Sequence, residues 1–374
     1  MNEDTSQGLI LISAGGTGGH LFPAEALAHE LKTRGWTVAL ATDSRATRYA
    51  DRFPEGEVHV IDSATPSGKN PIKLLGAGLA MMRGMRQARL LLRRLQPKAV
   101  IGFGGYPTIP PLFVAAGAFP TVIHEQNAVM GRANKLLSGR VTAIAGGFLK
   151  AEGALAGKIV ETGNPVRPAV IAAAETVFAP PTSDQTTELV VFGGSQGARF
   201  FSDTVPEAVA GLPETLRERL KITHQARAED EARVKSRYAE IGVSADIASF
   251  FTDLPTRIAG AHLVMSRSGA STVSEIAAIG RPAILVPYPH ALDHDQAANA
   301  AALEAAGGAL VRKQETLDVP SMSALFRELL SAPDKLARMA AAARAAGRPD
   351  STSLLADLVE AIASGSTVAA TKAR

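Results

Sequence analysis

Short apolar runs alternate with helical patterns along the first half of the chain, and several of these runs end in glycine-rich turns. The run at residues 9–13 leads into the turn at 15–19 and then into a predicted helix at 23–34. Further strands are predicted at residues 36–41, 98–103 and 121–124. Such an alternation is typical of a parallel sheet covered by helices on both faces.

The same pattern restarts after Arg167. Residues 188–192 form an apolar run that enters the glycine turn at 193–197, and a helical pattern resumes near 204–210. Further strands are predicted at residues 261–265 and 283–286. The simplest architecture is two Rossmann-like α/β domains joined near Arg167, which bind ligands in a cleft beside the carboxyl ends of their strands.

The first glycine turn reads Gly-Gly-Thr-Gly-Gly-His at residues 15–20. Its glycines let a ligand approach the backbone, and the free N–H groups at the start of a helix favour an anionic group. The turn fits neither the Walker loop nor the dinucleotide fingerprint. A plain strand-to-helix turn is the alternative, but the imidazole of His20 suits a general base and favours a functional site.

The second glycine turn, Gly-Gly-Ser-Gln-Gly at residues 193–197, has two chemical interpretations. It contains the Gly-x-Ser-x-Gly of a hydrolase nucleophile elbow, with Ser195 as nucleophile and Asp293 and His294 late enough to complete a triad. Alternatively, Ser195 and the following N–H groups cradle a phosphate at the start of a helix. The phosphate cradle is favoured because a hydrolase would leave the other glycine turns without a role; a structural turn is the third possibility.

Two further polar clusters follow apolar strands. His-Glu-Gln-Asn at residues 124–127 places Glu125 where it could tune a histidine and Asn127 where it could grip a sugar hydroxyl. A helix cap followed by solvated side chains is the alternative. The Ser/Gly-rich run at 266–275 frees backbone donors for phosphate, and Glu275 could accept ribose hydroxyls unless it is an ordinary exposed glutamate.

A third cluster, Asp-His-Asp-Gln at residues 293–296, includes an Asp-x-Asp pattern. Asp293 and Asp295 could hold a divalent metal beside a diphosphate, but a solvated loop is favoured, so no metal is predicted. Gln296 and Asn299 lie three residues apart, where they could share a helix face and offer neutral groups to sugar hydroxyls.

The formal net charge of +3 conceals a strongly basic segment with no acidic residue between Asp62 and Glu125. Apolar residues at 72–85 occupy one helical arc, and the arc shifts beyond Gly84, which predicts two helical pieces. Apolar surface beside clustered cations is typical of an interfacial membrane contact. Nucleic acid is disfavoured by an aromatic content of 5% and the lack of a recognition motif, and a solvated basic face is the third interpretation. The predicted contact residues are Lys69, Lys73, Leu75, Leu79, Met82, Arg83, Arg86, Arg89 and Arg93.

The composition excludes several classes of protein. A length of 374 residues suits about two domains, and a hydrophobic content of 46% excludes disorder over most of the chain. The chain has no cysteine, which removes disulfides, thiol catalysis and thiolate zinc sites. Residues 1–8 carry no basic side chain, and glycines and prolines interrupt the long uncharged stretch at 99–123. We therefore expect neither a signal peptide nor a spanning helix.

Six motifs occur in one order: those at residues 15–20, 124–127, 193–199 and 267–275, together with Gly-Phe-Gly-Gly-Tyr-Pro at 102–107 and Gly-Asn-Pro-Val-Arg at 163–167. In this order the chain strongly resembles the MurG type of glycosyltransferase, from about residue 9 to about residue 363. The resemblance implies the GT-B fold. It also implies an N-terminal acceptor-binding and membrane-contacting domain at 1–167, a helix at about 350–363 packed back on it, and a C-terminal UDP-sugar domain at 168–346.

The resemblance implies an inverting transferase at the cytoplasmic face of the bacterial membrane. It would move N-acetylglucosamine from UDP to the 4-hydroxyl of the N-acetylmuramoyl residue of lipid I, forming lipid II for peptidoglycan. His20 would be the general base, with Glu125 as a supporting or rival candidate. No cofactor or metal is expected. The alternatives are a related UDP-sugar transferase for another lipid such as diacylglycerol, and a non-catalytic UDP-sugar-binding subunit.

Motif matching also assigns the donor site. Asn127 and Gln296 would contact the sugar, and the run at 270–275 would surround phosphate and ribose. The chain departs from the family pattern at two places. Phe251 stands at a position that is often aliphatic and whose backbone meets uracil. The loop at 293–296 is longer than in some relatives and places Asp295 where a glutamine can occur. The full set is Thr17, Gly18, Gly19, Asn127, Arg167, Ser195, Phe251, Ala270, Ser271, Thr272, Val273, Ser274, Glu275 and Gln296.

Overall fold

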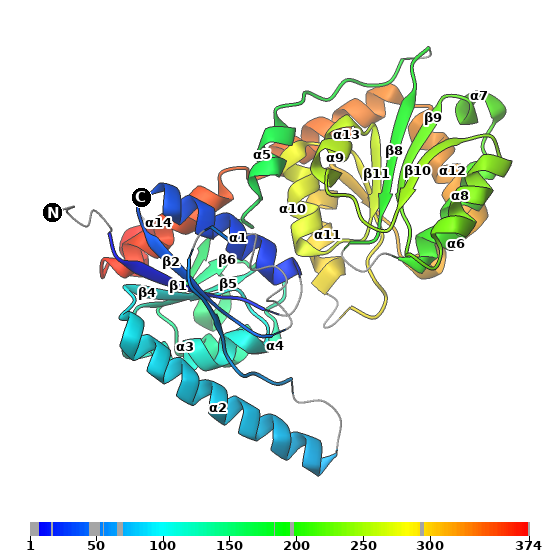
Figure 1. Ribbon diagram of the computed structural model, residues 1–374. Coiled ribbons are helices and arrows are strands. Elements are labelled where there is room, and N and C mark those ends of the chain that lie inside the picture. The colour runs from blue at the N-terminus through cyan, green and yellow to red at the C-terminus, as the bar shows by residue number, and fades with distance from the viewer. Residues whose placement is uncertain are drawn as a thin grey trace. The chain divides into compact units, whose positions relative to one another are not determined.

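The computed structural model describes residues 7–15, 18–44, 53–54, 56–65, 70–182, 184–194, 198–291 and 295–372. The chain divides into two compact units, Met1–Arg167 with Pro349–Arg374, and Pro168–Arg348. Each unit is a parallel sheet between layers of helices (Figure 1). The predicted α/β class with two parallel sheets is confirmed.

The first unit has seven strands in the order β3-β2-β1-β4-β5-β6-β7. The carboxyl ends of β1, β4 and β5 are neighbours, because Ser13 pairs with Gly102 and Gly102 with Ile123. The strands are β1 (Leu9–Ser13), β2 (Thr37–Thr42), β3 (Val58–Val60), β4 (Ala99–Gly102), β5 (Thr121–Glu125), β6 (Ala143–Gly146) and β7 (Ile159–Glu161). The helices are α1 (Gly18–Thr33), α2 (Pro71–Leu95), α3 (Ile109–Ala115), α4 (Arg132–Leu137), α14 (Ser351–Ala363) and α15 (Val368–Lys372).

Alternate residues of β1 are buried in two different hydrophobic cores, one on each face of the sheet. Ile10 and Ile12 are buried with α1 and α14, whereas Leu11 is buried with α2, α3 and α4. Successive side chains of a strand point to opposite faces, so the uninterrupted apolar run that predicted β1 reflects a sheet covered on both faces. The helix after β1 begins at Gly18 rather than at residue 23, so His20 lies in its first turn.

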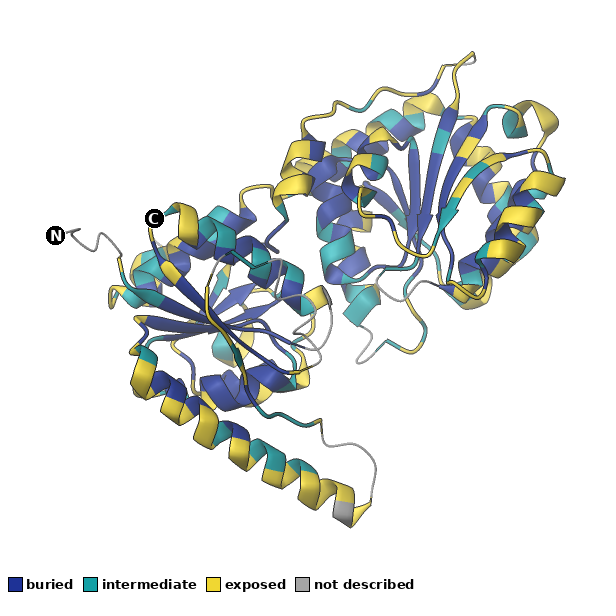
Figure 2. Ribbon diagram, in the orientation of Figure 1, coloured by how far each residue is buried: buried dark blue, intermediate teal, exposed yellow. Residues whose placement is uncertain are grey.

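The segment at 71–95 is one helix, so the prediction of two helical pieces is wrong. Gly84 lies where the helix meets the body of the unit, since a Cβ there would fall 1.9 Å from the carbonyl oxygen of Asp62. Beyond it, Ala88 and Leu92 are buried in the core, whereas before it the apolar side chains are largely exposed. The apolar arc shifts because the part of the helix before Gly84 is exposed, whereas the part after it packs on the core. Figure 2 shows the exposed part of the helix.

A network of hydrogen bonds centred on Arg34 holds α14 on α1. Its guanidinium contacts Glu30 at 2.8 Å, Asp357 at 2.5 Å and Glu360 at 2.8 Å. The indole N–H of Trp36 donates to the other oxygen of Glu360 at 2.8 Å. The chain therefore returns to the first unit after completing the second.

The second unit has six strands in the order β10-β9-β8-β11-β12-β13. They are β8 (Thr187–Phe192), β9 (Leu220–Gln225), β10 (Ser244–Ala248), β11 (Leu263–Ser266), β12 (Ala283–Leu285) and β13 (Ala309–Val311). The helices are α5 (Pro168–Ala174), α6 (Arg199–Ala210), α7 (Glu214–Arg217), α8 (Glu231–Glu240), α9 (Leu254–Gly260), α10 (Ala270–Ile279), α11 (Asp295–Ala305), α12 (Val319–Leu330) and α13 (Pro333–Ala346). Side chains of α6, α8 and α12 form the main core with the sheet.

Arg281 is buried where three helices of this unit end, with an exposed fraction of 2%. Its guanidinium donates to the carbonyl oxygens of Ala259, Ile279, Gly280 and Thr176, at or just beyond the last turns of α9, α10 and α5. Helix C-termini carry partial negative charge, which the cation complements. Burial nevertheless lowers the pKa of Arg281 to about 10.

Candidate functional site

His20 lies against the glycine turn that follows β4. A Cβ at Gly104 would fall 3.0 Å from Cδ2 and 3.1 Å from Nε2 of His20, and Gly104 has a φ of +89°. Only glycine both tolerates this conformation and leaves room for the ring. Burial lowers the pKa of His20 to about 4, so the imidazole is neutral at pH 7 and able to accept a proton.

Glu125 ends β5, and both of its carboxylate oxygens accept hydrogen bonds. Oε1 accepts from the backbone N–H of Asn127 at 3.0 Å and from its side-chain amide at 3.2 Å. Oε2 accepts from the backbone N–H of Gly131 at 2.9 Å and from the amide of Asn134 at 2.8 Å. The carboxylate thus organises the turn that carries Asn127, and this geometry favours its supporting role over its role as a rival base.

Neighbouring side chains of the same motif connect three segments of the first unit. His124 contacts the carbonyl oxygen of Gly163 through Nε2 at 3.1 Å, and burial lowers its pKa to about 4. Gln126 donates to the carbonyl oxygen of Phe103 at 2.8 Å, and Asn164 donates to that of Gln126 at 3.0 Å. The motifs at 102–107, 124–127 and 163–167 therefore form one hydrogen-bonded group.

Arg167 lies beside the first helix, with its guanidinium carbon 4.6 Å from the ring centroid of Phe22. Phe22 is two residues beyond His20 on α1. The contact places a cation at the helix whose start bears the first glycine turn. Thr17 lies outside the described residues; Gly18 and Gly19 are the first two residues of α1.

In the second unit, the turn after β8 is described as far as Gly194, which has a φ of +80°. Ser195 lies outside the described residues, as do Asp293 and His294, so neither the proposed phosphate contact nor the triad is located. Phe251 is buried, and the guanidinium carbon of Arg257 lies 4.3 Å from its ring centroid.

The helix α10 begins within the motif at residues 267–275. Ala270 and Val273 are buried in the fold, so only their backbone could meet a ligand, whereas Ser271, Thr272 and Ser274 are half-buried. Glu275 is buried as well, which rules out the alternative of an ordinary exposed glutamate.

Gln296 is held by two backbone donors. Its Oε1 accepts from the N–H of Tyr288 at 2.9 Å and from that of Ser268 at 3.3 Å. The side-chain NH2 is therefore the group that Gln296 can offer to a sugar hydroxyl. Asn299 is fully buried and donates to the carbonyl oxygen of Ser268 at 3.5 Å, which favours a packing role over a contact with the sugar.

Sequence reasoning missed Arg267, which orders the same region. Its guanidinium donates to the carbonyl oxygens of Val286 and Pro287 and, at 2.6 Å, to the side chain of Gln314. The rings of Phe200, Phe201 and Tyr288 surround it at 5.1–5.7 Å, and burial lowers its pKa. Nothing in the sequence of this serine-rich motif indicates that aromatic rings will surround its arginine.

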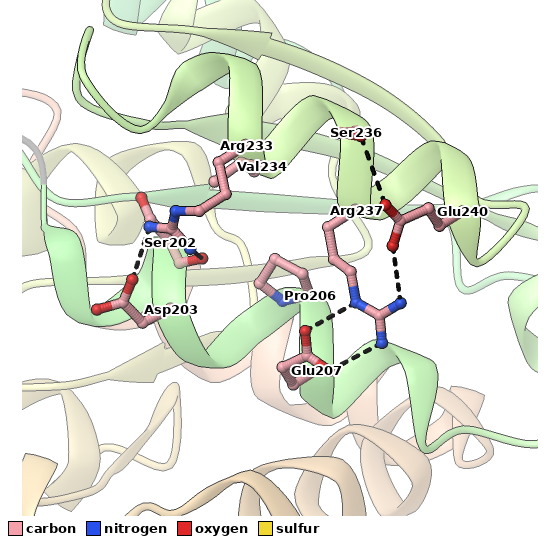
Figure 3. Close-up of a pocket in the computed structure, with 9 residues that line it drawn as sticks. All are labelled: Ser202, Asp203, Pro206, Glu207, Arg233, Val234, Ser236, Arg237 and Glu240. Atoms are coloured by element: carbon pink, nitrogen blue, oxygen red, sulfur yellow. Dashed lines mark hydrogen bonds and ion pairs between the residues drawn. The ribbon is translucent and has the colours of Figure 1, made fainter.

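The second unit also contains a groove. It has a volume of about 350 Å³ and lies between α6 and α8, where Arg233 and Arg237 pair with Asp203 at 2.6 Å and Glu207 at 2.7 Å (Figure 3). Its lining contains none of the predicted site residues. Within the described part of the chain, no group of three or more His, Asp or Glu side chains could hold a metal ion.

The basic helix α2 exposes both its cations and part of its apolar side chains. Leu75, Leu79 and Met82 have exposed fractions of 67%, 50% and 64%. Lys73, Arg83, Arg86, Arg89 and Arg93 are also exposed, and Lys69 lies outside the described residues. Within the described segments, no helix has the length and apolar character needed to cross a membrane.

Comparison with known proteins places both units in known families. Residues 10–146 match the glycosyltransferase family 28 N-terminal domain, and residues 188–355 match the glycosyltransferase family 28 C-terminal domain. The chain is 64% identical to a protein of Chelativorans sp. (98% of each chain) and 62% identical to one of Mesorhizobium japonicum (97% of each). Both carry the name UDP-N-acetylglucosamine--N-acetylmuramyl-(pentapeptide) pyrophosphoryl-undecaprenol N-acetylglucosamine transferase.

Solved structures share the arrangement of elements. Acinetobacter baumannii MurG superposes with a TM-score of 0.76 at 28% identity, over 94% of this chain and 98% of that chain. The calicheamicin glycosyltransferase superposes with a TM-score of 0.62 at 18% identity, over 95% and 98%, which shows the fold alone. These likenesses confirm the GT-B fold.

Proposed function

The chain belongs to the MurG family of glycosyltransferases, and from this premise we propose the reaction that it catalyses. It transfers N-acetylglucosamine from UDP-N-acetylglucosamine to the 4-hydroxyl of the N-acetylmuramoyl residue of lipid I, forming lipid II for peptidoglycan synthesis. The observation that carries this proposal is the 64% identity, over 98% of both chains, to a relative named for this transfer. The neutral imidazole of His20 beside Gly104 supplies the base that the transfer needs.

We propose a single displacement with inversion. As the acceptor 4-hydroxyl attacks C1 of the donor sugar, the bond from C1 to the diphosphate oxygen breaks and UDP leaves. The hydroxyl proton passes to His20, a step in which a positioned base typically contributes about 10²–10⁴-fold. Arg167 and the backbone N–H groups at the start of α10 are assigned to the charge that develops on the diphosphate.

The donor assignments follow the motif matches, and the contacts of the described residues support them. Asn127, whose turn is ordered by Glu125, is assigned to the sugar together with the NH2 of Gln296. Ser271, Thr272 and Ser274 are assigned to phosphate and ribose by their side chains, Ala270 and Val273 by their backbone, and Glu275 to the ribose hydroxyls. Thr17, Gly18, Gly19 and Ser195 complete the proposed site, and Phe251 meets the uracil through its backbone.

One experiment tests the reaction against its alternatives. UDP release from UDP-N-acetylglucosamine is measured with a lipid I analogue, with diacylglycerol and with neither. We expect release with the lipid I analogue alone. Release with diacylglycerol would favour a transferase for another lipid, and binding of the nucleotide sugar without release would indicate a non-catalytic subunit.

A substitution tests the base. His20→Ala should retain binding of UDP-N-acetylglucosamine, measured by calorimetry, and lose most turnover. An unchanged kcat would remove His20 from the role of base.

We further propose that the chain works as a peripheral protein at the cytoplasmic face of the membrane, with α2 as its contact. The exposed Leu75, Leu79 and Met82 lie on the same helix as the exposed cations. Each cation near an anionic bilayer contributes about 1 kcal/mol before screening. Lipid I is anchored by an undecaprenyl chain, so such a contact would bring the enzyme to its acceptor.

Reversal of charge tests this contact. Changing Arg86, Arg89 and Arg93 to Glu should weaken binding to anionic liposomes at low salt more than about 100-fold, since at least three attractions are lost. A matched control reverses the exposed Lys235, Arg327 and Arg338 of the second unit, with the same change in net charge. Equal weakening by both triple variants, or equal binding to neutral liposomes in high salt, would contradict the proposal.

A further inference from the structure

We propose that Gln225 is a positioning residue that fixes the spacing of the two turns assigned to the two ends of the nucleotide. This inference rests on the proposed function and deepens it. Gln225 is not itself assigned to the donor or the acceptor; its effect reaches the ligand through backbone groups of the turns after β8 and β10.

The side-chain amide of Gln225 joins these turns directly. Gln225 is the last residue of β9, which lies between β8 and β10 in the sheet. Its Oε1 accepts from the backbone N–H of Gly193 at 3.3 Å, and its Nε2 donates to the carbonyl oxygen of Ser249 at 3.1 Å. The residue is 6% exposed. One buried amide therefore spans the carboxyl ends of three neighbouring strands.

Each turn is assigned to a different part of the donor. Gly193 opens the glycine turn assigned to the diphosphate, and Ser249 lies two residues before Phe251, whose backbone is assigned to uracil. A nucleoside diphosphate contacts both turns at once, so its affinity depends on the distance between them. A tether that sets this distance before binding reduces the ordering cost that the ligand would otherwise bear.

The described residues beside the two bonds of Gln225 lie at exposed or conformationally free positions. β10 is the edge strand of the sheet, and Ser249 and Phe250 after it are exposed. On the other side, Gly194 has a φ of +80°, and glycine has more conformational freedom to lose than any other residue. The two bonds of Gln225 therefore restrain the chain at Gly193 and at Ser249, where these turns leave β8 and β10.

The test compares a ligand that spans both turns with one that reaches a single turn. Gln225→Met removes both hydrogen bonds while retaining most of the length and volume of the side chain. We expect the Kd for UDP to rise about tenfold and the Kd for uridine less than about threefold, with KM for UDP-N-acetylglucosamine raised and kcat within about threefold.

A matched control separates positioning from loss of stability. Phe326→Leu changes a fully buried side chain of α12 in the same unit and should lower the unfolding temperature without changing the ratio of the UDP and uridine Kd values. If Gln225→Met does not fold, Gln225→Glu is measured in the same way, since it retains an acceptor for Gly193 and loses the donor to Ser249.

The outcomes are distinct. Equal weakening of UDP and uridine binding, or no weakening, would overturn the role of Gln225 even if the native enzyme is fully active. Failure of the native protein to bind UDP or to release it from its nucleotide sugar would overturn the proposed function, on which this inference depends.

Discussion

The pH dependence of kcat/KM tests the environment of His20, because this parameter reports the ionisation of the free enzyme. The perturbation is a shift of pH from 7.5 to 5.5. An imidazole with the ordinary pKa of 6.5 is about 9% neutral at pH 5.5, whereas one with a pKa of about 4 is about 97% neutral. We therefore expect kcat/KM at pH 5.5 to stay within about 10% of its value at pH 7.5, where an unshifted base would lose about tenfold.

The assay is transfer of labelled N-acetylglucosamine to a lipid I analogue between pH 5.0 and 8.0. Both substrates carry diphosphate diesters, which do not titrate in this range. Enzyme held at pH 5.5 and then assayed at pH 7.5 shows whether acid unfolding contributes. Glu125→Gln should lower the rate without moving the acid limb, since the carboxylate acts through the turn that it organises. An inflection near pH 6.5 in intact enzyme would refute the assignment of His20 as a base with a lowered pKa.

Three further predictions concern other residues. Gly104→Ala should lower kcat and leave UDP binding unchanged, because a Cβ at 3.0 Å displaces His20 and the positive φ adds about 1–2 kcal/mol of strain; a normal kcat would contradict the tight fit. His124 and His224 have folded-state pKa values lowered by burial to about 4 and about 3, so the unfolded chain binds their protons first as the pH falls below 6.5. Each histidine should therefore lower the free energy of unfolding by about 2 kcal/mol between pH 7 and pH 5, measured by urea unfolding. The substitution His224→Gln should remove the contribution of His224, and an unchanged pH dependence in this variant would contradict that contribution. Arg281→Met should destabilise the second unit by about 3 kcal/mol or more, because four carbonyl oxygens lose their donor, and Arg281→Lys by less; equal stability of all three proteins would show that the buried cation is dispensable.

Several strands were predicted because strands covered on both faces require continuous apolar runs: β1, β2, β4, β5, β8, β11 and β12. The remaining strands β3, β6, β7, β9, β10 and β13 were not predicted. The prediction of two helical pieces failed at α2 because it took the shift of the apolar arc beyond Gly84 as a break between helices. The apolar side chains before Gly84 are largely exposed. A shift of the arc therefore marked a change of environment along one continuous helix.

The turns of the candidate site were predictable, but their connections were not. Glycine and polar residues after apolar strands identified the turns that carry His20 and Glu125. The partners of His124 and Gln225 are backbone groups of Gly163, Gly193 and Ser249, up to 39 residues away. Almost every residue has a backbone N–H and a carbonyl group, so the sequence does not indicate which of these groups a given side chain will contact. Only the order of strands in the sheet brings them together.

The return of the chain to the first unit through α14 makes the second unit an insertion. Ser351 and Thr352 donate to the carbonyl oxygens of Asn164 and Val166 at 2.5 and 3.2 Å, so the outgoing and returning segments are bonded to each other. A premature stop after Arg348 would therefore leave the second unit whole and remove α14 and α15 from the unit that carries His20. Because nucleotide binding is assigned to the second unit in the proposed function, we expect such a truncated chain to lose transfer to the acceptor and to retain binding of UDP.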